Sequence, residues 1–462
     1  MKYCLMALLS LVITVSAPSA AKQQPPEVGK PKDFNLAGTT DFELENGLHI
    51  TLIPYGNTPK ATISIVTQTG SYYDGDLSGL SELSYQLLTQ GTEQRTDVEI
   101  AQAAASMGGT ISTGSNVNSS FLFIDVLSEF TPDAASLLAE LVTQATIPQD
   151  ALQRVKNNRL RQLDIELSEA RTQADIAFYQ AIYADHPYAQ VVPNKDILDS
   201  ISTDDVKNFL NTNLTAKRSH VYVVGKFDAE KTTSVIRQTF STLATGQSAN
   251  IVKPEAKLKS NFTFVARKDA PQSTLRLGLP VVDPTHDDYV ALGAMNTLLG
   301  GSFASRITSN IREDKGYTYS PSSTVSPLVK SGLWYQSADV TAESTAAALK
   351  EIIKEITRLR EEPPSQEELA GIKRYSAGIF VLRNSSRFQI FNQLWFYKNH
   401  GLDRSVLEKY LSDLDSVTPE QISNMAKKYL TPENMTLVVV GDEETVKPQL
   451  ENEPTLNLWL AN

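Results

Sequence analysis

The chain has 462 residues, of which 41% are hydrophobic, and its 53 acidic and 42 basic residues give a formal net charge of −11 at pH 7. This acidic balance, with no dense basic stripe, argues against a nucleic-acid partner. The single cysteine is Cys4, so disulfides cannot stabilise the fold, which must rely on buried apolar surface. A chain of this length predicts two to three domains.

Residues 1–21 have the pattern of a secretory signal peptide. A positive charge at Lys2 precedes an apolar run over residues 3–15, and small residues close the segment. A retained membrane anchor is disfavoured because this run is shorter than a bilayer-spanning helix, and no second long apolar run follows. We therefore expect an exported, periplasmic protein with no stable membrane span. Residues 22–40, which are rich in proline and lysine, are expected to form a flexible tether.

The first predicted elements are strands and one amphipathic helix. Alternating or β-branched patterns predict strands within residues 42–54 and 61–69. The stretch GLSELSYQLLTQGT begins at Gly79 and predicts a helix that stops at Gly91. Its apolar residues fall at i, i+3, i+7 and i+8, which places them on one face, and they are Leu80, Leu83, Leu87 and Leu88.

A second helix follows, and its ends are marked by local signals. Thr96 with Glu99 forms a capping box pattern, and Gly108 with Gly109 closes the helix. Strands are predicted at 109–115 and 119–127, before a run of helices over 132–184.

The chain contains an internal repeat. LDSISTDDVKNFLNTNLTAKRSHVYVVG, from Leu198 to Gly225, aligns without gaps with LDSVTPEQISNMAKKYLTPENMTLVVVG, from Leu414 to Gly441, at an offset of 216 residues. Both segments open with a capping pattern and end in a β-branched strand followed by glycine. A unit of roughly 200 residues is therefore duplicated.

The repeat predicts an α+β fold made of two homologous domains in tandem. Each domain is expected to hold a mostly antiparallel sheet with helices packed on one face. The predicted boundaries are a first domain at 41–245, a linker at 246–260, a second domain at 261–450 and a C-terminal tail at 451–462.

Along almost all of the mature chain, the sequence resembles the pitrilysin/insulinase family of zinc peptidases, in its short two-domain form. The resemblance rests on the order and spacing of several motifs, which are LENGLHITLIP from Leu44, the glycine-leucine frame from Gly79, DHPYA from Asp185, LLGGSFASRITSNIREDKGYTYS from Leu298, and the two strand-glycine endings. The resemblance implies a peptidase-like fold of two related domains.

The resemblance also implies that the zinc motif is altered. Catalytic members carry His-x-x-Glu-His on the helix that matches Gly79 to Gly91, because two imidazoles hold zinc and the carboxylate acts as base. Here the stretch is Glu82-Leu83-Ser84-Tyr85-Gln86, so Glu82 and Gln86 stand at the histidine positions and Tyr85 at the base. Glutamine is a poor ligand and tyrosine cannot serve as a carboxylate base. We expect no metal and no cofactor in this chain.

Other residues offer no replacement for the motif. The family's third zinc ligand is a glutamate from the following helices, where Glu166 and Glu169 lie. No two histidines stand within five residues of each other, and they are His49, His186, His220, His286 and His400. We interpret His186, in DHPYA, as a structural turn residue.

A second family feature is retained. Members of the family carry an arginine and a tyrosine seven residues apart, which bind substrate and stabilise the oxyanion, and IREDKGYTYS supplies Arg312 and Tyr319. The alternative is that Arg312 caps a helix end and Tyr319 is a strand aromatic. Tyr317 is a competing tyrosine at the wrong spacing.

The resemblance therefore suggests a subunit that is inactive alone. We expect a heterodimer with a homologous zinc-bearing peptidase subunit, in which this chain binds extended peptides and supplies Arg312 and Tyr319 to the partner's active site. The zinc is expected in the partner. The alternative is a structural or peptide-binding assembly subunit with no part in proteolysis.

Overall fold

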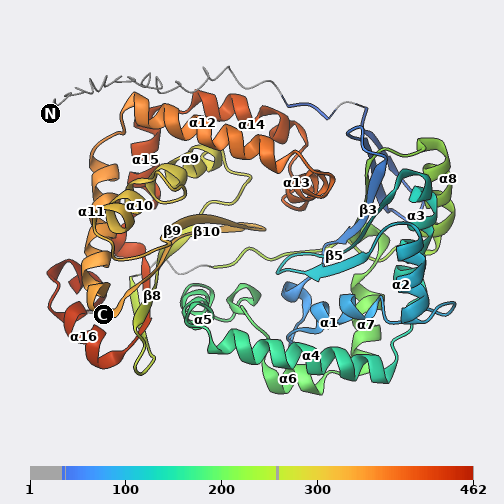
Figure 1. Cartoon of the computed structure of the whole chain (residues 1–462), viewed down its shortest axis with the longest axis horizontal. Helices are drawn as coiled ribbons and strands as arrows, with labels where there is room; N and C mark the ends of the chain where they lie inside the picture. The colour runs from blue at the N-terminus through green and yellow to red at the C-terminus, as the bar shows by residue number, and fades with distance from the viewer. Residues whose placement is uncertain (1–33, 37, 256–259, 461–462) are drawn as a thin grey trace, which may run out of the picture. The chain divides into compact units, whose positions relative to one another are not determined.

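Two β-sheets organise the chain (Figure 1). The five strands of the second sheet follow the order of five strands of the first, which has β1 as an additional edge strand. The first sheet has the order β1-β2-β6-β3-β5-β4, with β1 Thr40–Glu43, β2 His49–Pro54, β6 Ser219–Gly225, β3 Lys60–Thr67, β5 Ser120–Leu127 and β4 Ile111–Ser115. The second has the order β7-β11-β8-β10-β9, with β7 Asn261–Ala266, β11 Thr436–Gly441, β8 Gln272–Val281, β10 Ser331–Thr341 and β9 Ser322–Leu328.

This computed structural model describes residues 34–36, 38–255 and 260–460. The predicted signal peptide at 1–21 lies outside the described residues, as does most of the predicted tether. No helix in the described part of the chain is long and apolar enough to cross a membrane.

The duplication extends to strand pairing. In each sheet one pair of strands is parallel, β2 with β6 and β7 with β11, and the other pairings are antiparallel. Strands β6 and β11 are the two repeated strand-glycine segments, and they occupy equivalent positions, β6 between β2 and β3 and β11 between β7 and β8. The predicted α+β fold with two mostly antiparallel sheets is confirmed.

Helices follow in the same order in both halves. Those of the first half are α1 Leu80–Leu87, α2 Asp97–Ser106, α3 Thr131–Thr143, α4 Gln149–Ser168, α5 Ala170–Tyr183, α6 Lys195–Ser200, α7 Thr203–Asn213 and α8 Ala229–Thr239. Those of the second half are α9 Tyr289–Leu299, α10 Arg306–Thr308 with a π-helical turn at Ser309–Asp314, α11 Thr345–Glu361, α12 Gln366–Arg383, α13 Arg387–Asn399, α14 Ser405–Ser416, α15 Pro419–Tyr429, α16 Glu443–Glu451 and α17 Asn457–Leu460.

The predicted capping signals are formed. Thr96 with Glu99 and Thr418 with Gln421 make complete capping boxes at the starts of α2 and α15. Ser202 with Asp205 does the same at α7, since the shorter aspartate still reaches the backbone N–H of Ser202 at 2.8 Å. These boxes satisfy backbone donors that a helix start otherwise leaves free.

Helices of the same half cover one face of each sheet. In the first half, α3 and α8 pack over strands β2, β3, β5 and β6, and the core includes Ile50, Ile63, Leu138 and Ile236. In the second half, α9, α11 and α15 pack over β8, β10 and β11 around the buried Trp334. The C-terminal residues join this second core, because Trp459 is buried and its indole N–H donates to the Met435 carbonyl at 2.8 Å.

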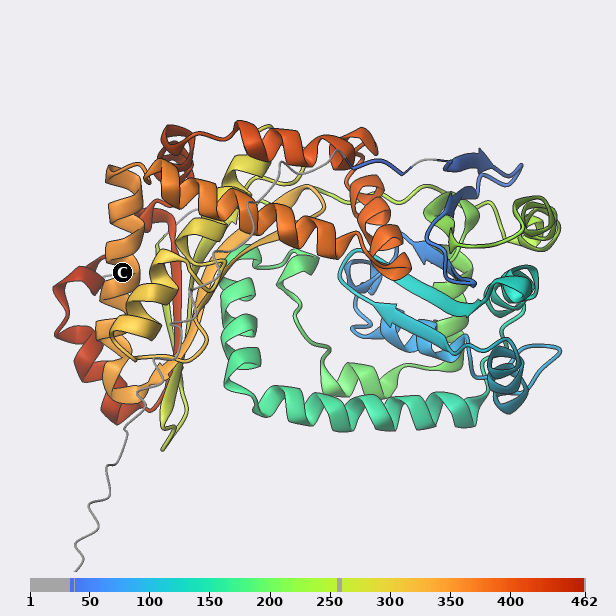
Figure 2. The same cartoon turned by 45° about the horizontal axis from the view of Figure 1, so that its top comes forward.

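The opposite face of each sheet is covered by a helix from the other half. Helix α13 lies against β3 and β6 of the first sheet, and α5 lies against β8 and β11 of the second, as Figures 1 and 2 both show. Phe391 of α13 packs in one cluster with Tyr222 of β6, and Phe178 of α5 packs with Val438 of β11. This covering explains why β6 and β11 are buried along their whole length and lack polar alternation.

Ion pairs also join α5 and α13 to the sheet of the other half. Arg276 of β8, which is only 7% exposed, donates from Nε to Asp175 of α5 at 2.6 Å. On the other sheet, Arg387 of α13 pairs with Asp125 of β5 at 2.8 Å. Charges that are largely out of water require such partners, so each exchanged helix is held by a cross-half pair as well as by apolar contact.

Candidate functional site

Helix α1 carries the altered motif, and its start is built around a buried carboxylate. Its four apolar residues, Leu80, Leu83, Leu87 and Leu88, are at most 5% exposed, which confirms the predicted stripe. Asp74 accepts hydrogen bonds from the backbone N–H groups of Gly79 and Ser81, both at 2.8 Å. Gly79 has φ of +92°, and a Cβ there would lie 2.7 Å from Leu198, so the turn requires glycine.

The titration of Asp74 makes the stability of this turn dependent on pH. Burial raises the pKa of Asp74 from 3.8 to about 6, although its hydrogen bonds to Ser81 and Gly79 oppose the shift. The folded protein therefore keeps this proton to a higher pH than the unfolded chain does. The protonated Asp74 carboxyl therefore stabilises the folded state fully below a pH of about 4, and this contribution is lost as the pH rises through about 6.

We expect Asp74→Asn to reveal this loss. Between pH 4 and pH 7, the free energy of unfolding of the wild-type protein should fall relative to that of the variant by up to about 3 kcal/mol. Urea unfolding of both proteins at a series of pH values measures this difference. A difference that does not change with pH would contradict the assignment.

Glu82 lies in an ion-pair cluster with an arginine from α4. Arg159 donates from Nε to Glu82 Oε2 at 2.7 Å and from a terminal nitrogen to Glu166 Oε2 at 3.0 Å. The arginine side chain is 7% exposed, whereas the two carboxylates are about one-third exposed, at 31% and 28%. Burial lowers the pKa of Arg159, but the two carboxylates outweigh it and hold that pKa above its ordinary value.

The other two motif positions are also occupied by local contacts. The Gln86 amide donates from Nε2 to Glu82 Oε1 at 3.3 Å, on the same face of α1. Tyr85 points into the core of the first half, where it is 0% exposed, and burial raises the pKa of its phenol. A buried neutral phenol cannot take a proton from water at neutral pH.

These residues do not fit a zinc ion. Both carboxylates near the motif already bind one guanidinium, and a metal would have to share them with that buried cation. Among the residues that the structure describes, no group of three or more His, Cys, Asp or Glu side chains is arranged to hold a metal. Glu169, the other glutamate considered for the ligand set, is exposed at the start of α5.

Arg312 and Tyr319 lie together in the second half. The guanidinium of Arg312 stacks between two aromatic rings, 4.4 Å from the centroid of Phe303 and 4.8 Å from that of Tyr319. Tyr319 is 82% exposed and Phe303 is 62% exposed, so the stack faces solvent. Tyr317 instead packs against the core of the second half, which supports Tyr319 as the tyrosine of interest.

The backbone beneath this stack is irregular. Arg312 lies in the π-helical turn Ser309–Asp314, and its carbonyl accepts from Gly316 at 3.2 Å. Such π-turns are rare and often occur at functional sites. Glu313, Asp314 and Lys315 are exposed around it, as expected for a solvated turn. The alternative in which Tyr319 is a strand aromatic does not hold, because Tyr319 precedes β9 and lies outside the sheet.

A cavity of about 860 Å³ opens beside α1. It is lined by α1, the end of edge strand β4, α4 and α5 of the first half, and by β9, β10 and α13 of the second. Glu82 and Arg159 form part of its wall, with Ser115, Tyr335 and Trp395 nearby. Its size suits a peptide segment or another small ligand.

The structure brings the predicted site residues into two groups. Glu82, Arg159 and Glu166 line the cavity, with Gln86 hydrogen-bonded to Glu82, and Arg312 and Tyr319 gather with Phe303 on the second half. Within the described ranges, no hydrogen bond, ion pair or ring contact links the two groups, and neither Arg312 nor Tyr319 lines the cavity.

Two residues of these groups, Arg159 and Phe303, were not predicted from the sequence. Arg159 and Phe303 carry no motif of their own, because their roles arise from contacts with residues distant in the chain or on another loop. His186 is a turn residue as interpreted. Its Nδ1 accepts from the Tyr188 backbone N–H at 3.2 Å at the start of a short 3-10 turn, Pro187–Ala189.

The fold and the altered motif together define a duplicated α+β protein of zinc-peptidase type without a metal-binding helix. A model of insulinase, peptidase family M16, matches residues 51–194, and a model of the peptidase M16 inactive domain matches residues 200–375. The chain belongs to the insulinase family, peptidase family M16. The model that matches residues 200–375 is the one named for the inactive domain of this family.

The similar proteins include one named as a zinc protease and one named as a non-peptidase homolog. The chain is 22% identical over 407 residues to an uncharacterized zinc protease YmxG of Bacillus subtilis, covering 87% of this chain and 97% of that one. It is 24% identical over 383 residues to a non-peptidase homolog YmxG of Helicobacter pylori, covering 82% and 88%.

Solved structures share the fold over most of the chain. A peptidase M16 inactive domain from Pseudomonas fluorescens superimposes with a TM-score of 0.83 at 24% identity, covering 89% of this chain and all of that one. A protease from Helicobacter pylori gives 0.80 at 20% identity, with the same coverage. A chain of complex III from Candida albicans gives 0.75 at 13% identity, covering 87% and 96%.

Proposed function

We propose that this protein is the non-catalytic subunit of an exported, periplasmic M16 peptidase and forms a heterodimer with a homologous subunit that carries zinc. In this arrangement the chain binds an extended peptide and presents Arg312 and Tyr319 to the partner's active site. A guanidinium and a phenol are suitable donors to the oxyanion that develops on a peptide carbonyl during hydrolysis.

The observation that carries the proposal is the contrast between the two groups of site residues. Glu82 of the motif helix and Glu166 are paired with the buried Arg159, so a metal would have to compete with that cation for them. The Arg312 stack is left open, with the Tyr319 ring 82% exposed. Exposed aromatic and arginine side chains are the residue types that dominate protein interfaces.

The cavity beside α1 supports a role in holding peptide. Strand β4 is the last strand of the first sheet, so its outer edge has free backbone groups that could pair with an extended peptide. β9 is likewise the last strand of the second sheet, and the cavity is lined by residues at the ends of both strands, including Ser115 and Ser326.

Co-expression with a homologous subunit bearing His-x-x-Glu-His tests this function. We expect the two chains to co-purify and to cleave unstructured peptides, and we expect chelator to abolish the cleavage. The matched control is the same pair with the glutamate of the partner's motif replaced by glutamine, which should be inactive. Chelator-sensitive cleavage by this chain alone would overturn the proposal.

A structural assembly role is the alternative. It is favoured by the likeness to a chain of complex III from Candida albicans, a likeness in fold alone at 13% identity. Purification from native membranes and from the soluble periplasmic fraction separates the two. A soluble zinc-containing partner supports the peptidase subunit, whereas recovery within a membrane complex that lacks peptidase activity supports the assembly role.

A further inference from the structure

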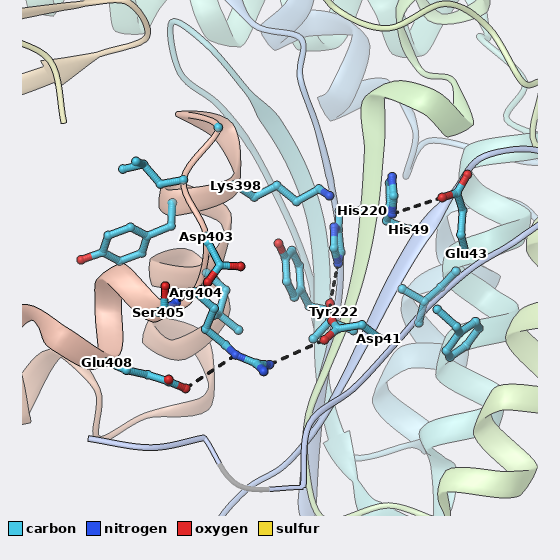
Figure 3. Close-up of a pocket in the computed structure, with 17 residues that line it drawn as sticks. Asp41, Glu43, His49, His220, Tyr222, Lys398, Asp403, Arg404, Ser405 and Glu408 are labelled. Atoms are coloured by element: carbon cyan, nitrogen blue, oxygen red, sulfur yellow. Dashed lines mark hydrogen bonds and ion pairs between the residues drawn. The ribbon is translucent and has the colours of Figure 1, made fainter. Parts of the chain in front are cut away.

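A second cavity, of about 680 Å³, lies where the first sheet meets the exchanged helix (Figure 3). It is lined by β1, β2 and β6 of the first half and by α13, α14 and their connecting loop of the second. None of its lining residues belongs to the altered motif or to the Arg312 stack. The volume is within the range of small-molecule sites.

Its floor holds a histidine whose protonation can be deduced from hydrogen bonds. Thr51 donates its single hydroxyl proton to Asp41 Oδ1 at 2.6 Å. The hydroxyl oxygen of Thr51 lies 2.7 Å from His220 Nε2. Because the hydroxyl proton is already used, Nε2 must be the donor to Thr51. Nδ1 of the neutral ring therefore carries a lone pair. That atom is buried, with no hydrogen-bond partner among the described residues.

The His220 ring is held firmly in place. It stacks on Tyr222 at 4.0 Å and on His49 at 5.9 Å, because β2 and β6 are parallel neighbours with His49 opposite His220. His220 is 5% exposed. Burial holds its pKa well below its ordinary value, and the nearby charge of Lys398 and then His49 lower it further.

Lys398 of α13, an exposed lysine, is the second polar group at this cavity. In Figure 3 its amino end points toward the rings of His220 and His49. Within the described chain its amino group makes no hydrogen bond or ion pair. Burial lowers the pKa of Lys398, and the more distant carboxylates of Asp41 and Glu43 only partly oppose this.

The acidic residues around the cavity are already engaged. Asp41 lies 3.6 Å from Arg404, which in turn lies 3.7 Å from Glu408. Asp403 accepts from the Ser405 backbone N–H at 2.8 Å, at the start of α14. Glu43 lies 3.8 Å from His49 Nδ1 and is more than half exposed. The described residues therefore offer no acceptor to Lys398, and His220 Nδ1, which accepts in the neutral ring, can donate to an anion only once the ring is protonated.

We propose that this cavity binds a carboxylate, with Lys398 Nζ as donor to one oxygen and His220 Nδ1 as donor to the other. On binding, His220 takes up one proton from solvent, so that the neutral ring becomes an imidazolium paired with the carboxylate. Charge-assisted hydrogen bonds of this kind are roughly twice as strong as neutral ones. The carboxylate belongs either to the C-terminus of a short peptide or to a free organic acid.

Titration calorimetry on the purified full chain tests the proposal with three probes, the dipeptide Ala-Ala, its C-terminal amide, and succinate. We expect at least one free carboxylate to bind and the amide to bind at least roughly tenfold more weakly. Repeating the titration in buffers of different ionisation enthalpy should show uptake of about one proton near pH 7, with tighter binding as the pH falls.

Two lysine variants locate the site. Lys398→Met should weaken binding by roughly 10- to 100-fold, whereas Lys409→Met, an exposed lysine of α14 outside the cavity, should leave it unchanged. Binding of Ala-Ala alone identifies a peptide terminus, and binding of succinate alone identifies an organic acid. Equal binding of the amide, binding without proton uptake, or no saturable heat from either carboxylate up to about 10 mM would overturn the proposal.

Discussion

Arg312→Ala is expected to lower the turnover of the proposed heterodimer by roughly 10²- to 10³-fold, the usual effect of removing one oxyanion donor. The chain itself should fold normally, because the Arg312 side chain is partly exposed, at 25%, and its ion pair among the described residues is with the exposed Glu313. Steady-state cleavage of an unstructured peptide by the co-purified pair measures the effect. The loss should appear in kcat more than in KM.

Three further variants distinguish donation from stacking. Arg312→Lys keeps the charge but loses the planar contact with Phe303 and Tyr319, so it should give an intermediate rate. Tyr319→Phe keeps the ring over Arg312 and removes only the hydroxyl. Arg374→Ala, at an exposed position on α12, is the matched control and should leave turnover unchanged. If Arg312→Ala had a normal rate, the stack of Arg312 with the two rings would be a surface contact without a catalytic role.

Arg159→Leu is expected to lower the free energy of unfolding by about 3 kcal/mol. The substitution leaves Glu82 and Glu166 facing each other without the cation that now separates them. We take the lower end of the range for broken buried pairs because both carboxylates retain contact with water. Urea unfolding at pH 7 measures the change.

Two controls separate charge from packing. The triple variant Glu82→Gln, Arg159→Leu, Glu166→Gln removes both unpaired carboxylate charges as well. It should recover a large part of the lost stability. Arg161→Ala, two residues away on the exposed face of α4, should change stability by less than about 0.5 kcal/mol. If Arg159→Leu were as stable as the wild-type protein, the cluster would be a surface feature without a structural role.

Local features of the fold were predictable because their causes lie within a few residues. The stripe of Leu80, Leu83 and Leu87 follows from helical periodicity, and the capping boxes at Thr96 and Thr418 follow from spacing alone. The internal repeat predicted two related sheets, which β6 and β11 confirm by their equivalent positions. The altered motif was visible because Glu82, Tyr85 and Gln86 are adjacent in sequence.

Features that depend on distant contacts were not predictable. Glu82 and Arg159 are 77 residues apart, and nothing in either local sequence marks the pair. His49 and His220 meet only because β2 pairs with β6 in one register, so a rule based on nearby histidines could not find them. The crossing of α5 and α13 to the opposite sheet is likewise a property of the assembled fold.

That crossing has a consequence for how the chain can be divided. Phe178 and Phe391 each complete a core whose strands belong to the other repeat, so a fragment ending in the linker would expose the sheet face that α13 normally covers. Either fragment produced alone should aggregate, whereas the two produced in the same cell should reassemble into a nicked but native protein. Gene fission of this sequence is therefore viable only when both pieces are inherited together and reach the same compartment.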